Sequence, residues 1–144
     1  MNGLNGWTIA QDDALGVRTY YDRDTSGRVI AESVPRTDAD GTLRTQVTQT
    51  TYDDKGRVTR ADRPDGSYAT TTYTAIDTPA SVCEGTRCTT YVYDNAGREI
   101  EQHDPDGGVT SKTFDANGNV ASETDRAGRT TKYVYDAADR LTTT

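Results

Sequence analysis

The sequence has few of the residues from which a conventional hydrophobic core is built. Hydrophobic residues make up 32% of its 144 positions, with one Phe, one Trp and one Met, and the mean hydropathy is −0.85. Such a composition is typical of disordered chains. However, the nine Tyr residues and the many Thr residues favour β-strands, and the charges are dispersed along the chain. We therefore expect a folded chain with a thin core, or with a core that neighbouring repeats complete.

Long apolar runs and clusters of basic residues are also missing. No stretch is long and apolar enough to cross a bilayer, and the first residues lack the basic and apolar segments of a signal peptide. The formal net charge is −7, and the Lys and Arg residues stand singly among carboxylates. Nucleic-acid binding requires a clustered basic surface. The sequence therefore predicts neither a membrane span nor a nucleic-acid partner.

Residues for metal and catalytic chemistry are scarce. Two Cys residues and the single His103 do not supply the four ligands of a structural zinc site. His103 lies in a polar stretch with no Ser or Cys partner, which favours a solvated histidine over a general base. The Asp-rich residues 38–41 and 115–119 lack the distal Glu of a calcium loop and fit side-chain-bonded turns instead. We expect no metal, no cofactor and no catalytic residue.

The sequence does contain an internal repeat. Aromatic residues recur at nearly constant steps along the chain, at Tyr52, Tyr73, Tyr93, Phe114 and Tyr135. An Asp follows four of them, as Asp53, Asp94, Asp115 and Asp136. A Gly follows three of the aromatics after four residues (Gly56, Gly97, Gly118) and three after fourteen residues (Gly66, Gly107, Gly128). Three registers that stay in phase predict a tandem repeat.

Each landmark of the repeat has a local structural meaning. The glycines supply the positive φ of tight turns, and Asp65-Gly66 and Asp106-Gly107 are dipeptides typical of β-hairpins. Between turns, Thr and Tyr alternate with other residues as they do in strands. One unit is therefore strand, turn, strand, turn. The sequence predicts an all-β meander in which each hairpin supports the next, burying a Tyr and an aliphatic residue such as Val58, Val120 or Leu141.

The units are not all alike. We expect residues 1–19 to be a lead-in or capping segment, and residues 20–144 to form about six hairpin units from a longer array. The step from Tyr21 to Tyr52 is about half as long again as the later steps between aromatics, and the step from Tyr21 to Gly27 is two residues longer than in later units. The first unit is therefore expected to carry insertions, including a longer turn. Asp77 and Asp139 stand where a turn Gly is expected.

The two cysteines bracket a loop where the repeat predicts a hairpin turn. Cys83 and Cys88 flank four residues, and opposed positions of two antiparallel strands lie within disulfide reach. We expect a disulfide that clips this turn. Free thiols in a reducing compartment are the alternative.

Residues 93–141 carry a recognisable pattern: Tyr-Asp-x-x-Gly-Arg, then Asp-Pro-Asp-Gly, then a Thr-rich stretch back to an aromatic-Asp pair. This pattern resembles the YD repeats of the Rhs family, which also occur in teneurins and in the shell components of toxin complexes. The resemblance implies strands wound into a hollow shell that encloses a toxic polypeptide, or that serves in extracellular adhesion. Full shells of this kind carry a self-cleaving aspartate element. It is absent here, since Asp104 to Gly107 fit the turn of the repeat, and we expect no autoproteolysis.

Three functions are compatible with this pattern. The first is a structural segment of a shell or stalk that encloses or displays another polypeptide. The second is an adhesion module for a glycan or protein, with Tyr rings as stacking platforms. The scarcity of other large apolar residues favours rings that fill the inner face of the sheet instead. The third is a subunit that joins identical chains through open edge strands. The resemblance and the expected disulfide favour a secreted or cell-surface protein, with a cytoplasmic toxin-precursor shell as the alternative.

Overall fold

In the computed structural model, which describes residues 7–143, all regular secondary structure is β-strand. The strands are antiparallel and follow chain order from β1 to β12, and β13 pairs with β14. The predicted all-β fold of tandem hairpins is thereby confirmed. No helix among residues 7–143 is long and apolar enough to cross a membrane. The backbone contacts divide the chain into two units that meet at Thr70 and Thr71, and each unit is described by itself.

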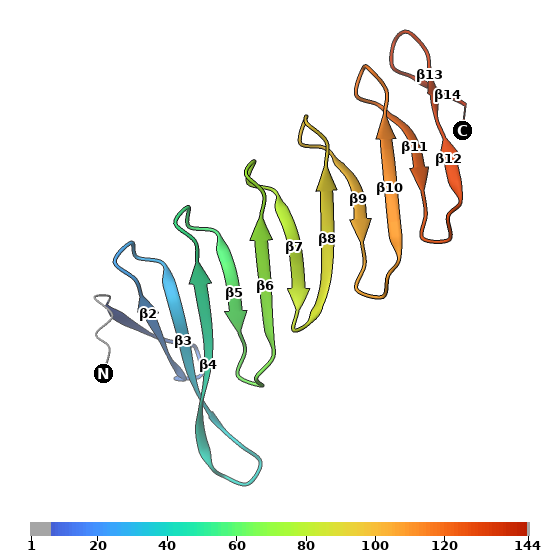
Figure 1. The fold of residues 1–144 in the computed structure, drawn as a ribbon. Helices are drawn as coiled ribbons and strands as arrows, with labels where there is room; N and C mark the ends of the chain where they lie inside the picture. The colour runs from blue at the N-terminus through green and yellow to red at the C-terminus, as the bar shows by residue number, and fades with distance from the viewer. Residues whose placement is uncertain (1–6, 144) are drawn as a thin grey trace. The chain divides into compact units, whose positions relative to one another are not determined.

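The first unit is a meander with one unusually long hairpin. Its strands are β1 (Thr8–Asp12), β2 (Arg18–Arg23), β3 (Val29–Thr37), β4 (Leu43–Tyr52), β5 (Val58–Asp62) and the first half of β6 (Tyr68–Tyr73). Strands β3 and β4 have 9 and 10 residues, whereas β5 has 5. Figure 1 shows the β3–β4 hairpin running past the β5–β6 turn. The insertion that the spacing predicts therefore lengthens this hairpin.

The second unit is more regular. After the second half of β6 come β7 (Pro79–Glu84), β8 (Arg87–Tyr93), β9 (Glu99–His103), β10 (Val109–Phe114), β11 (Val120–Thr124), β12 (Thr130–Lys132), β13 (Val134–Tyr135) and β14 (Leu141–Thr143). Consecutive strands pair from β7 to β12 (Figure 1). This regularity follows from the even spacing of aromatic and Gly residues.

Almost every described turn has the same three-residue form. In the turn at Asp53, the N–H of Gly56 donates to the Asp53 carbonyl at 2.9 Å, and the N–H of Asp53 donates to the Arg57 carbonyl at 3.0 Å. Gly56 has φ 82°. This is a type I turn closed by a left-handed residue, the usual three-residue hairpin loop. The turns at Asp65-Gly66 and Asp106-Gly107 are built in the same way, so their Gly closes the loop.

Two turn predictions are wrong in detail. The cysteine loop is a two-residue turn because Glu84 pairs with Arg87, which leaves Gly85 and Thr86 between the strands. The first unit has no longer turn, since its loop begins at Asp24 and closes at Gly27 like the others. The two additional residues belong to β2, and Arg23 occupies the place that an aromatic residue fills in later units.

The burial predicted for the aliphatic residues is mostly wrong. Cys83, with 7% of its surface exposed, is the only buried hydrophobic residue among those described. Val58 and Leu141 are 39% and 52% exposed, and Val120 is half-buried. No helix lies among residues 7–143, and nearly all side chains on both faces of the described strands stay partly exposed to solvent. The sheet is therefore held mainly by backbone pairing and by contacts between its turns.

Candidate functional site in the YD turns

The repeat-defining aromatics and aspartates lie at one kind of turn. We call the turns that begin at Asp24, Asp53, Thr74, Asp94, Asp115 and Asp136 the YD turns. In an antiparallel meander, alternate turns lie at the same ends of the strands. The YD turns of each unit therefore lie at one end of its strands. The turns that Gly66, Gly107 and Gly128 close lie at the other end.

A β-bulge marks the aromatic residue before the YD turns. The pairing register shifts at Tyr52, Tyr93, Phe114 and Tyr135, and also at Arg23 in the first unit. A bulge bends the strand and redirects the neighbouring side chain. The recurring bulge thus explains why these aromatics hold the same place at successive turns.

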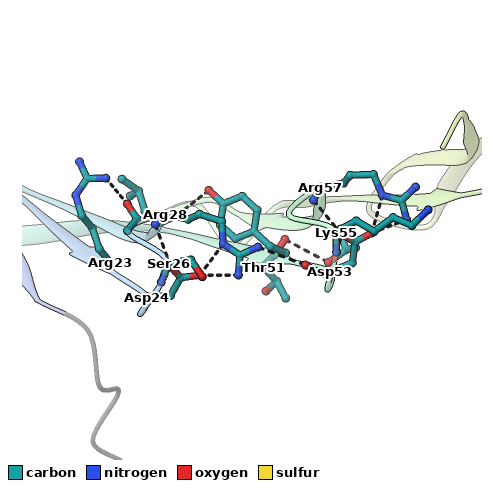
Figure 2. Close-up of polar contacts among 12 residues, drawn as sticks. Arg23, Asp24, Ser26, Arg28, Thr51, Asp53, Lys55 and Arg57 are labelled. Carbon is teal, nitrogen blue, oxygen red and sulfur yellow. Dashed lines mark hydrogen bonds and ion pairs between the residues drawn. The ribbon is translucent and has the colours of Figure 1, made fainter.

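Where a YD turn begins with Asp, that Asp organises the loop through both carboxylate oxygens. Oδ1 of Asp53 accepts the N–H groups of Lys55 and Arg57 at 3.0 and 2.9 Å, and Oδ2 accepts Nε of Arg57 at 2.7 Å (Figure 2). Asp24, Asp94 and Asp136 make the same three kinds of contact. One side chain thereby fixes the loop backbone and the Arg that follows the closing residue.

These contacts lower the pKa of the turn carboxyls. The Arg57 guanidinium, and then its backbone N–H, hold the pKa of Asp53 below its ordinary value. At Asp94 the backbone N–H of Arg98 is the larger cause of the lowered pKa and its guanidinium the next. The pKa of Asp136 is likewise lowered by Arg140. Hydrogen bonds to a carboxylate favour its ionised form, so the turns are built around charged Asp.

In the first unit the Arg of one YD turn binds the aromatic residue of the next. The Arg28 guanidinium lies over the Tyr52 ring, 4.7 Å from its centroid, and Nη1 of Arg28 donates to the Asp53 carbonyl at 3.4 Å. The Tyr52 hydroxyl donates to the Val29 carbonyl at 2.9 Å. Arg28 itself is held by Asp24 (Figure 2). An Arg that is held by the Asp of its own turn therefore also binds the following repeat.

The second unit repeats these contacts with different residues. The Tyr93 hydroxyl donates to the Pro79 carbonyl at 2.9 Å, in the place that corresponds to Val29. The guanidinium carbon of Arg98 lies over the Phe114 ring, 4.2 Å from its centroid. A cation over an aromatic face contributes roughly 0.5–1 kcal/mol at an exposed site. The aromatic-plus-Arg pairing is thus the recurring link between neighbouring repeats.

The closing glycines lie against the preceding repeat. A Cβ added to Gly97 would come within 3.1 Å of Cδ1 of Ile76, and one added to Gly56 or Gly118 within 3.4 or 3.5 Å of an Arg Nη1. All three positions therefore need a residue that adopts a positive φ, and Gly97 also needs the space beside Ile76.

Between the YD turns that begin at Asp115 and Asp136, amide side chains take the place of the Arg and aromatic pair. Asn119 stands where Arg is found elsewhere, and its Nδ2 donates to Oδ1 of Asp139 at 2.8 Å. Nδ2 of Asn117 donates to the same oxygen at 3.0 Å. Asp139, which has φ 57° in place of the usual closing Gly, thus connects two turns.

At the opposite ends of the strands, a charged side chain also joins two turns. Arg126 pairs with Asp104 at 3.2 Å and also with Asp106 of the preceding turn. Asp104 and Asp106, in the stretch that superficially resembles a cleavage element, are therefore part of an inter-repeat contact.

The structure places most of the predicted residues at the turns. The aromatics and aspartates at Tyr52, Tyr93, Phe114, Tyr135 and Asp53, Asp94, Asp115, Asp136 all belong to YD turns, and Tyr73 precedes the turn at Thr74. Sequence reasoning missed the role of the arginines. The signal was the Gly-Arg dipeptide at residues 27–28, 56–57 and 97–98, whose regular phase marks a structural partner of the Asp.

The cysteines face each other away from the YD turns. Cys83 pairs with Cys88, their Cα atoms are 4.0 Å apart, and their Sγ atoms are joined at 2.11 Å. That these thiols are oxidised in the native protein stays a prediction. No group of three or more His, Cys, Asp or Glu side chains within residues 7–143 is arranged to hold a metal ion.

Comparison with known protein families identifies the repeat. The RHS Repeat model matches residues 83–109 and 114–144, which include the YD turns at Asp94, Asp115 and Asp136. Among curated proteins the search found no similar sequence. The resemblance read from the aromatic-Asp and Gly-Arg pattern is therefore confirmed.

Solved structures share the fold. The crystal structure of TcdB2-TccC3 is 16% identical with a TM-score of 0.73, over 91% of this chain and 8% of that one. The Tc holotoxin pore of Photorhabdus luminescens, with a variant TccC3, is 12% identical with a TM-score of 0.57, over 87% of this chain and 7% of that one. The chain thus spans about 8% of the length of the TcdB2-TccC3 chain it matches.

Proposed function

We propose that this chain, a member of the Rhs/YD-repeat family, is a wall segment of a shell or stalk that encloses or displays another polypeptide, and that it has no catalysis of its own. The observation that carries this proposal is the series of contacts between consecutive YD turns. Arg28 with Tyr52 and Arg98 with Phe114 hold one repeat to the next. Contacts that recur with the repeat serve its continuation rather than a single reaction centre.

The comparisons support a role in a larger assembly. The matched crystal structure is a TcdB2-TccC3 protein, and another match belongs to a Tc holotoxin pore. The chain corresponds to a small fraction of each. We further propose a secreted or cell-surface location, in agreement with a disulfide at Cys83 and Cys88.

A tandem fusion tests the structural role. Two copies of residues 20–144 would be joined so that the spacing of the aromatic residues continues in phase across the junction. A wall segment should extend its sheet across the junction, so the fusion should melt at a higher temperature than the single chain in one transition. An out-of-phase junction with two additional Gly residues is the control. Equal melting temperatures for both fusions and the single chain would contradict a structural continuation.

Electron microscopy across a concentration series separates this function from the alternatives. A wall segment should give small particles of constant size at all concentrations. Long fibres that grow with concentration would instead support self-assembly through edge strands. Specific glycan binding without a change of mass would support an adhesion module.

A further inference from the structure

The long β3–β4 hairpin departs from the repeat in the part that extends beyond the regular strand length. The step from Asp24 to Asp53, which begin consecutive YD turns, is longer than the step from Asp94 to Asp115 in the regular repeats. The additional residues extend both strands beyond the β5–β6 turn (Figure 1). We call residues 34–46 the projecting hairpin. In a chain built from near-identical units, an extension at one place indicates a local function.

The projecting hairpin places two arginines side by side. Arg36 is paired directly with Arg44 across the strands, so both side chains lie on the same face of the sheet. Like charges directly opposite each other destabilise a strand pair. Arg44 forms an ion pair with Asp38 at 2.7 Å, but Arg36 has no ion-pair partner among residues 7–143. Both arginines are exposed.

A hollow lies beside this arginine pair. Its volume is about 430 Å³, and Arg44, Gln46, Arg63, Pro64 and Asp38 are among the residues that line it. It lies between the hairpin and the β5–β6 turn, entirely within the first unit. The volume falls in the range of ligand sites, and two arginines, Arg44 and Arg63, and one carboxylate, Asp38, line the hollow.

We propose that this face of the projecting hairpin binds an acidic peptide segment of a partner protein. The planar guanidinium forms paired hydrogen bonds with carboxylates. A carboxylate between Arg36 and Arg44 would relieve their repulsion, and a second would enter the hollow beside Arg63. Charge complementarity selects an acidic partner. The proposal does not rest on the wall function, because it concerns the part of this hairpin that extends beyond the regular repeat.

The test uses the full chain and a fluorescein-labelled peptide of six consecutive Glu residues. Fluorescence anisotropy should show binding at about 50 mM salt that weakens strongly at about 300 mM salt, since exposed charges are screened. The double variant Arg36→Gln and Arg44→Gln should lose affinity by at least about tenfold. The control variant Arg18→Gln and Arg87→Gln, which removes two exposed arginines elsewhere, should bind as the original chain does.

A charge-reversal variant separates recognition from folding. Arg36→Glu should abolish peptide binding and raise the melting temperature by roughly 1–4 °C, because a glutamate at this position would pair with Arg44 across the strands. Lost binding therefore cannot result from an unfolded chain. The proposal is overturned by no binding at low salt or by equal losses in the two double variants. Binding to vesicles of anionic phospholipid without binding to the peptide would also overturn it.

Discussion

At the scale of single residues, each turn depends on a closing position that few residue types can occupy. Gly97 has φ 78° and lies close to Ile76 of the preceding repeat, whereas Gly66 has φ 83° with open space around its Cα. The two glycines therefore separate the cost of backbone conformation from the cost of crowding between repeats.

Substitution of these glycines should show both costs. Gly66→Ala should lower the free energy of unfolding by about 1–2 kcal/mol, the cost of a left-handed conformation for a residue with a Cβ. Gly97→Ala should cost more, because its Cβ would also meet Ile76 at 3.1 Å. Urea denaturation measures both values. Gly97→Asn should be milder than Gly97→Ala, since Asn tolerates this conformation. Equal losses at the two positions would show that Ile76 moves aside without cost.

The turn carboxyls should make stability depend on acid pH. The pKa values of Asp53, Asp94 and Asp136 are lower in the folded chain than in the unfolded chain. Their contribution is therefore complete above about pH 5, starts to fall as pH approaches the unfolded-state pKa near 4, and is lost as pH falls through the folded-state pKa values. The melting temperature should be level from pH 7 to about pH 5 and then decline steeply.

The variant Asp53→Asn should flatten part of this decline, because an amide at this position does not titrate. Asp54→Asn provides the matched control one residue later, at an exposed position of the same turn. Thermal melts of both variants at pH 7 and pH 3 measure how far the melting temperature falls between the two pH values. A decline that is as steep in Asp53→Asn as in the original chain would assign the acid sensitivity to other groups.

The sequence specifies the turns better than it specifies the packing. The phase of Gly and aromatic residues predicted the meander because a turn needs particular residue types at fixed offsets. The predicted burial of Val58 and Leu141 was wrong because alternation defines faces of a strand but does not show whether anything covers them. The role of Arg28 was also missed, since its partner Tyr52 belongs to the next repeat and the contact exists only once the sheet is formed.

At the scale of hairpins, repeats with Tyr and repeats with Phe at the aromatic position differ in one hydrogen bond. The Tyr52 hydroxyl donates to the Val29 carbonyl, one residue beyond Arg28. Phe114 lies over Arg98 and has no hydroxyl for the equivalent carbonyl of Glu99. We expect Tyr52→Phe to lower the free energy of unfolding by about 0.5–1.5 kcal/mol, and Phe114→Tyr to raise it by a similar amount. Chemical denaturation of both variants gives the answer, and a loss in Phe114→Tyr would mean that the two links are not equivalent.

The cysteine hairpin should be stabilised by its disulfide. Cys83 and Cys88 close a loop of six residues, for which the chain-entropy relation gives roughly 2 kcal/mol. The variant Cys83→Ser and Cys88→Ser should lose about this amount, and reductant should destabilise the original chain but not the variant. Mass spectrometry of the purified chain under non-reducing conditions, after thiol alkylation, reports the oxidised state directly. Two alkylated thiols in the native protein would contradict the disulfide.

At the scale of the whole molecule, described contacts beyond backbone pairing join repeats that are neighbours in the chain. The links from Arg28 to Tyr52, from Arg98 to Phe114 and from Asn119 to Asp139 each span one repeat. In an array of this kind, stability is approximately a sum of local terms and nearest-neighbour terms. A defect at one turn should therefore remain local.

Hydrogen exchange of Gly97→Ala tests this locality. Amide exchange should accelerate in β8, β9 and β10, which flank the altered turn, and should stay unchanged in β2 and β3, because opening is confined to cooperative units. In the original chain, exchange should be fastest in β13 and β14, which have two and three residues. A uniform acceleration over all strands would show a single cooperative fold, and stability would then depend on the array as a whole rather than on each interface between repeats.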